Sequence, residues 1–192
     1  AAGSRSFLAN YVDGDADGIA LNAARTLLVL AHEQVHQLHD LMWRGGAPLP
    51  TWMGEGLAHY YGLKALARSD LPPDVVDRAM QAYIDPARPI EASLVEYQRR
   101  YASGDMEAYE MFYFQGATLW SEVDRLLREA TPEAGGLDAL VPEIMQLHGS
   151  GDGMPEALQA RLLALCGEPM ADLLARMVGE LPGWGRPRDE FR

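Results

Sequence analysis

The sequence predicts a mainly α-helical domain, and three observations support this expectation. Apolar residues recur at the three- and four-residue spacing of amphipathic helices from about Ile19 almost to the end of the chain. Breaks containing Gly and Pro divide this pattern into segments of helical length. A pattern typical of a strand occurs only in one short stretch, Ser6–Val12. The 192 residues fit one domain that can fold without disulfides or a metal.

Residues 1–18 are expected to form a short N-terminal segment, which could be the end of a β region. Ser6–Val12 predicts a strand, and Asp13–Gly18 predicts an acidic turn. The acidic run resembles part of a calcium-binding loop, but such a loop ends with a glutamate at its twelfth position, where this chain has Ala24. We therefore expect a turn rather than a calcium site.

Two long helices are predicted next, joined by a short connection. The first runs from about Ile19 to Met42 and stops at the break Gly45–Pro50. The second begins near Met53 and runs to about Arg68. This break allows the second helix to fold back on the first.

The rest of the chain predicts one further long helix among shorter ones. Pro72 and Pro73 suit the first turn of a helix that ends near Tyr83, and Asp105 can cap a long helix that ends near Glu129. Shorter helices are expected over Ile90–Tyr101, Leu137–His148, Met154–Leu165 and Pro169–Glu180. The helical domain would thus span residues 19–181, before an irregular tail rich in Pro, Gly and Arg over residues 182–192.

Charge and composition argue against several classes of partner. The 28 acidic residues outnumber 16 basic ones, and no Lys/Arg cluster is present, so a nucleic-acid partner is not expected. No apolar run approaches the ~18 residues of a membrane span. Cys166 is the only cysteine, so no internal disulfide can form, which fits a cytoplasmic protein or one exported without disulfides. The oligomeric state stays open.

The residues that point to chemistry are His32-Glu33-Gln34-Val35-His36. Two histidines at positions i and i+4 of a helix lie about 6 Å apart along its axis, so their imidazoles can converge on one tetrahedral zinc ion. Glu33 would lie beside the metal rather than on it, where it can take a proton from an activated water. By itself, the motif also fits an amphipathic helix with two structural histidines.

Glu55 is the expected third ligand, because a catalytic zinc usually has three protein ligands and an open position. It follows His36 after 18 intervening residues and lies near the start of the second helix. Alone, it could equally be an acidic residue favoured at a helix N-terminus. Together, His32, His36 and Glu55 predict one Zn²⁺ ion per chain.

These residues resemble the gluzincin metallopeptidases. The pattern His-Glu-x-x-His, then 18 residues, then Trp-x-x-Glu-Gly over Trp52–Gly56 is similar to the aminopeptidase N and glycyl aminopeptidase families. Tyr60-Tyr61-Gly62 is closer to the glycyl aminopeptidase branch. The resemblance is close over residues 28–63 and loose over residues 107–181. It implies a helical catalytic subdomain of the thermolysin-like type.

The resemblance extends to a tyrosine. Phe112–Ala117 is similar to the Tyr-x-x-Gly-Ala segment of the family, which implies that Tyr113 donates a hydrogen bond to the tetrahedral intermediate. The chemistry agrees, because a phenol is a neutral donor that can stabilise a developing oxyanion. Tyr109, one turn earlier, is the competing tyrosine.

Several other polar residues lie near the motif, and two of them have alternative roles. Asp40 could orient His36 or be a solvated residue at the helix end. His59 could orient Glu55, contact substrate or be an ordinary polar helix residue, whereas His39 is expected to be structural and His148 is given no role.

Two departures limit the resemblance. The family has a β-rich region before the zinc helix, with a strand that holds extended peptide, but only about 18 residues precede the helix here. The family's Gly-x-Met-Glu-Asn segment, whose Glu binds the free amine of the substrate, is missing, and Asp13–Asn22 occupies its place. Aminopeptidase specificity therefore does not carry over, and the chain fits the helical half of a larger protein.

The favoured expectation is zinc-dependent hydrolysis of a peptide or protein substrate, with Glu33 as general base and Tyr113 as oxyanion donor. Whether cleavage is internal or terminal stays open. The first alternative is a non-catalytic zinc-binding recognition or scaffold domain derived from a peptidase. The second is a helical interaction module without metal.

Overall fold

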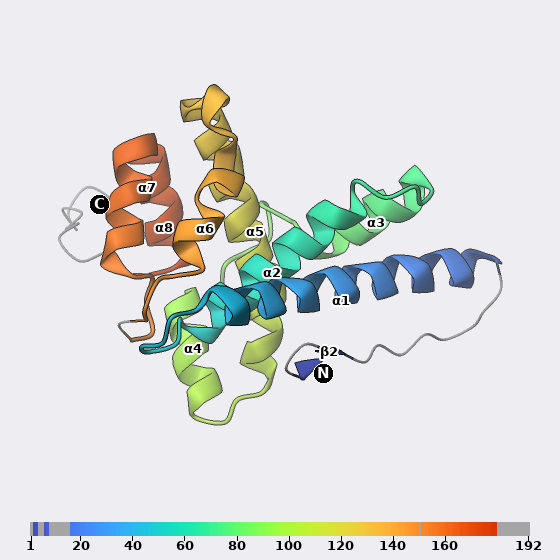
Figure 1. Ribbon diagram of the computed structural model, residues 1–192, viewed down its shortest axis with the longest axis horizontal. Helices are drawn as coiled ribbons and strands as arrows, with labels where there is room; N and C mark the ends of the chain where they lie inside the picture. The colour runs from blue at the N-terminus through green and yellow to red at the C-terminus, as the bar shows by residue number, and fades with distance from the viewer. Residues whose placement is uncertain (1, 4–5, 8–15, 150, 180–192) are drawn as a thin grey trace, which may run out of the picture.

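The structure is a computed structural model, and it describes residues 2–3, 6–7, 16–149 and 151–179. Within these ranges it is mainly α-helical, which confirms the predicted fold class (Figure 1). The predicted tail over residues 182–192 lies outside the described residues. No described helix has both the length and the apolar character that crossing a membrane requires.

The helices follow one another along the chain with short connections. They are α1 (Ala16–Met42), α2 (Thr51–Leu66), α3 (Pro73–Tyr83), α4 (Leu94–Ala102), α5 (Glu107–Ala130), α6 (Val141–Ile144), α7 (Glu156–Cys166) and α8 (Glu168–Met177). Two 3₁₀ turns, η1 (Pro132–Ala134) and η2 (Gly136–Ala139), lie between α5 and α6. A two-residue antiparallel pair, β1 (Ala2–Gly3) and β2 (Ser6–Phe7), precedes α1.

The N-terminal predictions are partly corrected. A strand does begin at Ser6, but Asp13–Asp15 and residues 8–12 lie outside the described residues. Ala16–Gly18, expected in an acidic turn, forms the start of α1 instead. An aspartate is favourable in the first turn of a helix, so an acidic run suits a helix start as well as a turn.

Local capping accounts for where two of the helices begin. Asp105 accepts hydrogen bonds from the backbone N–H groups of Glu107 (3.1 Å) and Ala108 (3.4 Å), which confirms it as the cap of α5. The helix expected from Ile90 begins only at Leu94, because the Ser93 side chain accepts from the N–H of Glu96 at 3.1 Å and sets the start there.

The single helix predicted over Leu137–His148 is wrong. The chain forms η2 and then the short helix α6, which ends at Ile144. Pro142 explains the break, because it has no N–H to donate and its ring clashes with the carbonyl one turn earlier in a continuous helix.

Helix α2 is the centre of the molecule, with α1 packed on one side and α5 crossing it on another (Figure 1). The largest fully buried side chains line these contacts, among them Trp52 and Met53 of α2 and Phe112 and Trp120 of α5. Helix α5 also contacts α4, α7 and α8, so it connects the α1–α2 pair to the C-terminal helices.

The close approach of these helices depends on glycines. A Cβ added to Gly56 of α2 would lie 2.8 Å from the Cα of Gly116 in α5, and one added to Gly116 would lie 2.9 Å from the Cα of Gly56. On the other side of α2, a Cβ at Gly62 would lie 2.9 Å from the carbonyl oxygen of Leu28 in α1. Real Cβ atoms do not come this close to backbone, so both crossings require a residue without a side chain.

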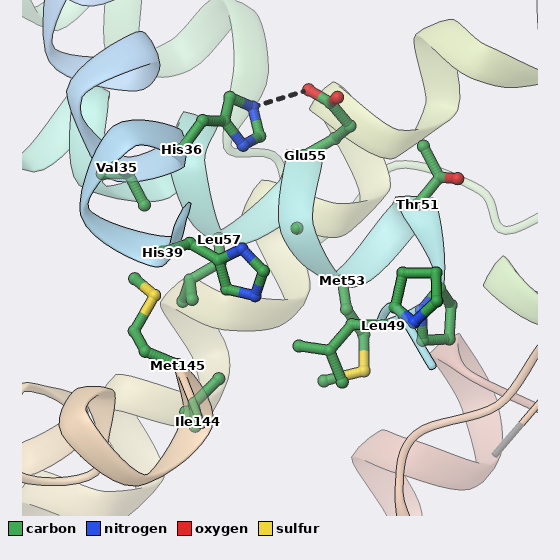
Figure 2. Close-up of a pocket in the computed structure, with 13 residues that line it drawn as sticks. Val35, His36, His39, Leu49, Thr51, Met53, Glu55, Leu57, Ile144 and Met145 are labelled. Carbon is green, nitrogen blue, oxygen red and sulfur yellow. Dashed lines mark hydrogen bonds and ion pairs between the residues drawn. The ribbon is translucent and has the colours of Figure 1, made fainter. Parts of the chain in front are cut away.

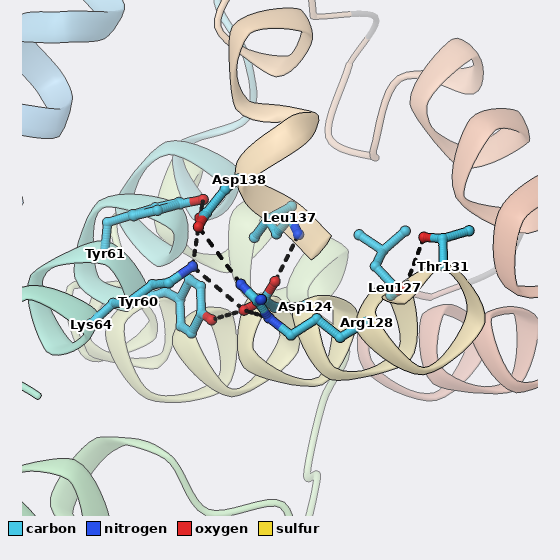
Figure 3. Close-up of polar contacts among 9 residues, drawn as sticks. All are labelled: Tyr60, Tyr61, Lys64, Asp124, Leu127, Arg128, Thr131, Leu137 and Asp138. Atoms are coloured by element: carbon cyan, nitrogen blue, oxygen red, sulfur yellow. Dashed lines mark hydrogen bonds and ion pairs between the residues drawn. The ribbon is translucent and has the colours of Figure 1, made fainter. Parts of the chain in front are cut away.

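A polar cluster around the buried Asp124 fixes the C-terminal half of α2 against α5 and η2 (Figure 3). Asp124 accepts hydrogen bonds from the Tyr60 hydroxyl at 2.6 Å, the Leu137 N–H at 2.7 Å and Arg128 Nε at 3.1 Å. Burial alone would raise the pKa of Asp124, but these hydrogen bonds more than offset it and hold the pKa below its usual range. Lys64 contacts both Asp124 and Asp138, so every charge in the cluster has a partner.

We expect Gly116→Ala to destabilise the fold by roughly 1–3 kcal/mol or more, because the new methyl group overpacks the crossing with Gly56. Gly54→Ala is the matched control on α2: its Cβ would meet no atom within 4 Å, and alanine should stabilise the helix by up to about 1 kcal/mol. Urea unfolding followed by circular dichroism measures both. Equal losses in the two variants would contradict the role assigned to the crossing.

Candidate metal centre

The structure brings His32, His36 and Glu55 together at the contact between α1 and α2. The Nε2 atoms of the two histidines are 3.0 Å apart. Oε2 of Glu55 lies 3.1 Å from Nε2 of His32 and 3.4 Å from Nε2 of His36. One turn of α1 therefore presents two ring nitrogens to one carboxylate oxygen of α2, in the pairing that the 18-residue spacing predicts.

The donor set fits a zinc ion. Tetrahedral zinc with nitrogen and oxygen ligands at about 2.0–2.1 Å places neighbouring ligand atoms roughly 3.3–3.4 Å apart. The three observed separations, 3.0, 3.1 and 3.4 Å, are close to that edge length. One proton can bridge only two of these three atoms at a time, whereas a cation on the common centre satisfies all three. His-His-carboxylate is also a ligand set that catalytic zinc sites use.

The surroundings of Glu55 keep its carboxyl group ionised, as an anionic metal ligand must be. Burial would raise its pKa, but hydrogen bonds to His32, His36 and the Tyr109 hydroxyl more than offset burial and hold the pKa far below its usual range. The pKa of His36 is raised, chiefly by its hydrogen bond to Glu55, against the opposite effect of burial. The carboxylate of Glu55 is thus ionised throughout the physiological pH range.

Tyr109 has a closer role at this site than the sequence indicates. Its hydroxyl donates a hydrogen bond to Oε1 of Glu55 at 2.8 Å, leaving Oε2 facing the two histidines. Only its position one turn before Tyr113, on the same face of α5, could have pointed to this contact. A carboxylate ligand with its second oxygen held in this way has a fixed orientation.

Tyr113 lies beside the ligand set rather than within it. Its ring centroid is 5.7 Å from that of His32 and 5.4 Å from that of Tyr109. Burial raises the pKa of Tyr113, so its hydroxyl keeps its proton and can act as a neutral donor. The sequence placed this tyrosine near the site, and the structure does so too.

Glu33 is half-buried, and within the described part of the chain no hydrogen bond to its carboxylate is present. Its charge adds to the raised pKa of His36, after the larger effect of the Glu55 hydrogen bond. It also adds to the raised pKa of Tyr113, after the larger effect of burial. The charge of Glu33 therefore acts on both groups, and Glu33 is not one of the three candidate ligands.

The structure also places the polar residues outside the candidate ligand set, Asp40, His39 and His148. Asp40 has a 77% exposed side chain and lies 3.8 Å from Nδ1 of His39, so the structure favours a solvated residue over a partner of His36. His39 stacks near Trp43, with ring centroids 6.4 Å apart. His148 lies against the backbone of Gly46 in the connection between α1 and α2.

His59 faces the site from α2. Its buried ring lies 5.6 Å from that of His32 and 5.1 Å from that of Tyr113, centroid to centroid. Burial, followed by the nearby charge of His32, lowers the pKa of His59 to about 3, so the ring is neutral. Nε2 of His59 and Nδ1 of His32 are both buried without a hydrogen-bond partner among the described residues. His59 therefore packs beside the ligands rather than orienting Glu55.

We expect the purified protein to bind one zinc ion per chain. Glu55→Ala removes a ligand and should weaken zinc binding by more than the roughly 10–100-fold typical of changes outside the ligand set. Asp40→Ala removes an exposed carboxylate on α1 and should leave affinity unchanged. Competition with a chromophoric chelator measures all three affinities. Equal affinities for the wild type and Glu55→Ala would show that zinc does not bind here.

Comparisons of the chain with models of protein families, with curated proteins and with solved structures find no match. The case for a function therefore depends on the geometry of the site and on the motif residues themselves.

Proposed function

We propose that this protein is a zinc-dependent peptidase of the gluzincin type. The observation that supports this best is the convergence of His32 Nε2, His36 Nε2 and Glu55 Oε2 within 3.0–3.4 Å of one another. A structural zinc site would use four protein ligands, whereas the described residues offer three, as in catalytic sites with one open position.

Zinc, when bound, supplies a Lewis acid that polarises a carbonyl and lowers the pKa of water to near neutrality. Glu33 then serves as the general base. It follows His32 directly on α1, is half-buried and lies near the ligands without being one of them. Its carboxylate accepts a proton from the attacking water and returns that proton to the leaving amine.

Tyr113 stabilises the charge that develops on the carbonyl oxygen. Burial keeps its hydroxyl protonated, so it can donate a hydrogen bond to the oxyanion without contributing a charge of its own. It lies on α5, with its ring centroid 5.7 Å from that of the candidate ligand His32. Tyr109 acts differently, because its hydroxyl is already committed to Glu55 at 2.8 Å.

We expect Glu33→Gln to retain zinc and to lose roughly 10²–10⁴-fold in turnover, because the amide cannot accept the proton. Cleavage of a broad peptide library followed by mass spectrometry, together with zinc content, measures both properties. Glu129→Gln, the same change on an exposed part of α5, is the control and should cleave as the wild type does. A wild type that binds zinc and cleaves nothing would instead favour the recognition or scaffold alternative.

Replacing Tyr113 and replacing Tyr109 should change different properties, turnover in the first case and zinc affinity in the second. Tyr113→Phe is expected to lower kcat by roughly 10²–10³-fold with zinc affinity unchanged, as for loss of one oxyanion donor. Tyr109→Phe is expected to weaken zinc affinity by roughly 10–100-fold, because Glu55 loses the partner of its second oxygen. If Tyr109→Phe impairs kcat and leaves zinc affinity intact, then Tyr109 is the oxyanion donor.

A further inference from the structure

Two buried ring nitrogens beside the candidate metal centre have no hydrogen-bond partner among the described residues. They are Nδ1 of His32 in α1 and Nε2 of His59 in α2. Both residues are only 7% exposed, so bulk solvent does not serve these atoms. Buried polar atoms in native proteins are nearly always hydrogen-bonded, either to protein or to a bound water. Each of these two nitrogens therefore needs a partner when the site is formed.

The surroundings of His59 restrict where its Nε2 can find that partner. Three rings pack around it, with centroid distances of 4.2 Å to Tyr83, 5.1 Å to Tyr113 and 5.6 Å to His32. Of these three neighbours, only His32 also has a buried nitrogen without a partner. The two histidine rings lie edge to face, with an interplanar angle of 71°. The two unmatched nitrogens thus belong to side chains that are next to each other.

The metal centre decides which nitrogen of His32 carries a proton. Nε2 is the atom that converges with His36 and Glu55, so a bound cation needs that nitrogen unprotonated. The single proton of the neutral ring then lies on Nδ1, which becomes a hydrogen-bond donor. A histidine that binds a metal almost always donates this second N–H to a carboxylate, a carbonyl or a water. Within the described ranges, no carboxylate or carbonyl accepts from Nδ1 of His32.

We propose, resting on the zinc centre of the function above, that His59 is a positioning residue for His32: its Nε2 accepts the hydrogen bond of His32 Nδ1–H through one bound water. A neutral imidazole has one acceptor nitrogen, which in His59 is Nε2. Two hydrogen bonds of about 2.9 Å span at most roughly 6 Å, and the ring centroids are 5.6 Å apart, so one water is enough. The link holds His32 in the tautomer that presents Nε2 to the metal.

Packing alone does not explain a histidine at position 59. An apolar ring of the same size would fill the space without burying a nitrogen that lacks a partner, and such a nitrogen lowers the stability of the fold. His59 follows Glu55 by one helical turn, so both residues lie on the face of α2 that meets α1. The polar ring is thus placed where an acceptor for His32 is needed.

The first test measures the zinc affinity of the full chain by competition with a chromophoric chelator. His59→Phe keeps a ring and removes the acceptor, so zinc should bind roughly 10–100-fold more weakly, as when other ligands lose their hydrogen-bond partner. His59→Gln places an amide oxygen near the position of Nε2 and should restore most of that affinity. Tyr83→Leu removes the ring packed 4.2 Å from His59 and leaves both nitrogens in place, so its zinc affinity should equal that of the wild type.

The second test locates the protons by NMR of the zinc-loaded wild type labelled with ¹⁵N-histidine. Long-range ¹H–¹⁵N correlations distinguish the two tautomers of each ring. We expect the proton on Nδ1 in both His32 and His59, which leaves Nε2 of His59 as an acceptor. A proton on Nε2 of His59 overturns the proposal, because that nitrogen would then be a donor. This measurement needs no variant, so it stands even where a substitution prevents folding.

The outcomes distinguish the role of His59 from the peptidase function. Wild-type zinc affinity in His59→Phe, an equal loss in Tyr83→Leu, or no recovery in His59→Gln overturns the role of His59 and leaves the peptidase function standing. Zinc-loaded protein that cleaves no peptide but shows the expected affinities and tautomers overturns the peptidase function and supports the role of His59. A chain that binds no zinc overturns both.

Discussion

The contact on which this structure depends is the crossing of α2 and α5 at two glycines. Gly56 follows the candidate ligand Glu55 directly, and Gly116 follows Tyr113 after two residues. Where these glycines touch, α5 comes close enough for Tyr109 to reach the carboxylate of Glu55 and for Tyr113 to lie beside His32. The spacing 109, 113, 116 keeps the two tyrosines and the crossing on one helix face. The same contact thus orders the core and assembles the site.

The meeting of the three candidate ligands could be predicted from sequence because its geometry is local. His32 and His36 are four residues apart on one helix, and a single Gly/Pro break returns α2 to them. Helix spacing and one connection are therefore enough to predict their meeting with Glu55. The helices themselves were predictable for the same reason, except where Pro142 divides a continuous apolar pattern into η2 and α6.

Features that depend on long-range packing were not predictable in this way. The hydrogen bond from Tyr109 to Glu55 joins residues 54 apart in the chain. Asp40 has the right spacing to contact His36 along α1, yet its side chain is exposed, since a position on the same helix face does not fix where a side chain at the helix end points. An apolar pocket beside His36 and Glu55 is closed in part by Ile144 of α6, which no local pattern connects to the start of α2 (Figure 2).

Glu55 lies between two glycines with opposite effects, and this contrast explains how α2 serves both the core and the site. Gly56 removes a side chain so that another helix can approach, while Gly54 removes one where nothing approaches. Both weaken the intrinsic helical preference of the segment. At Gly56 the cost is offset by packing, because Trp52, Met53 and Leu57 around it are buried. At Gly54 no contact offsets the cost of glycine to helix stability. The helix forms there because the surrounding core already holds this turn of α2 in place.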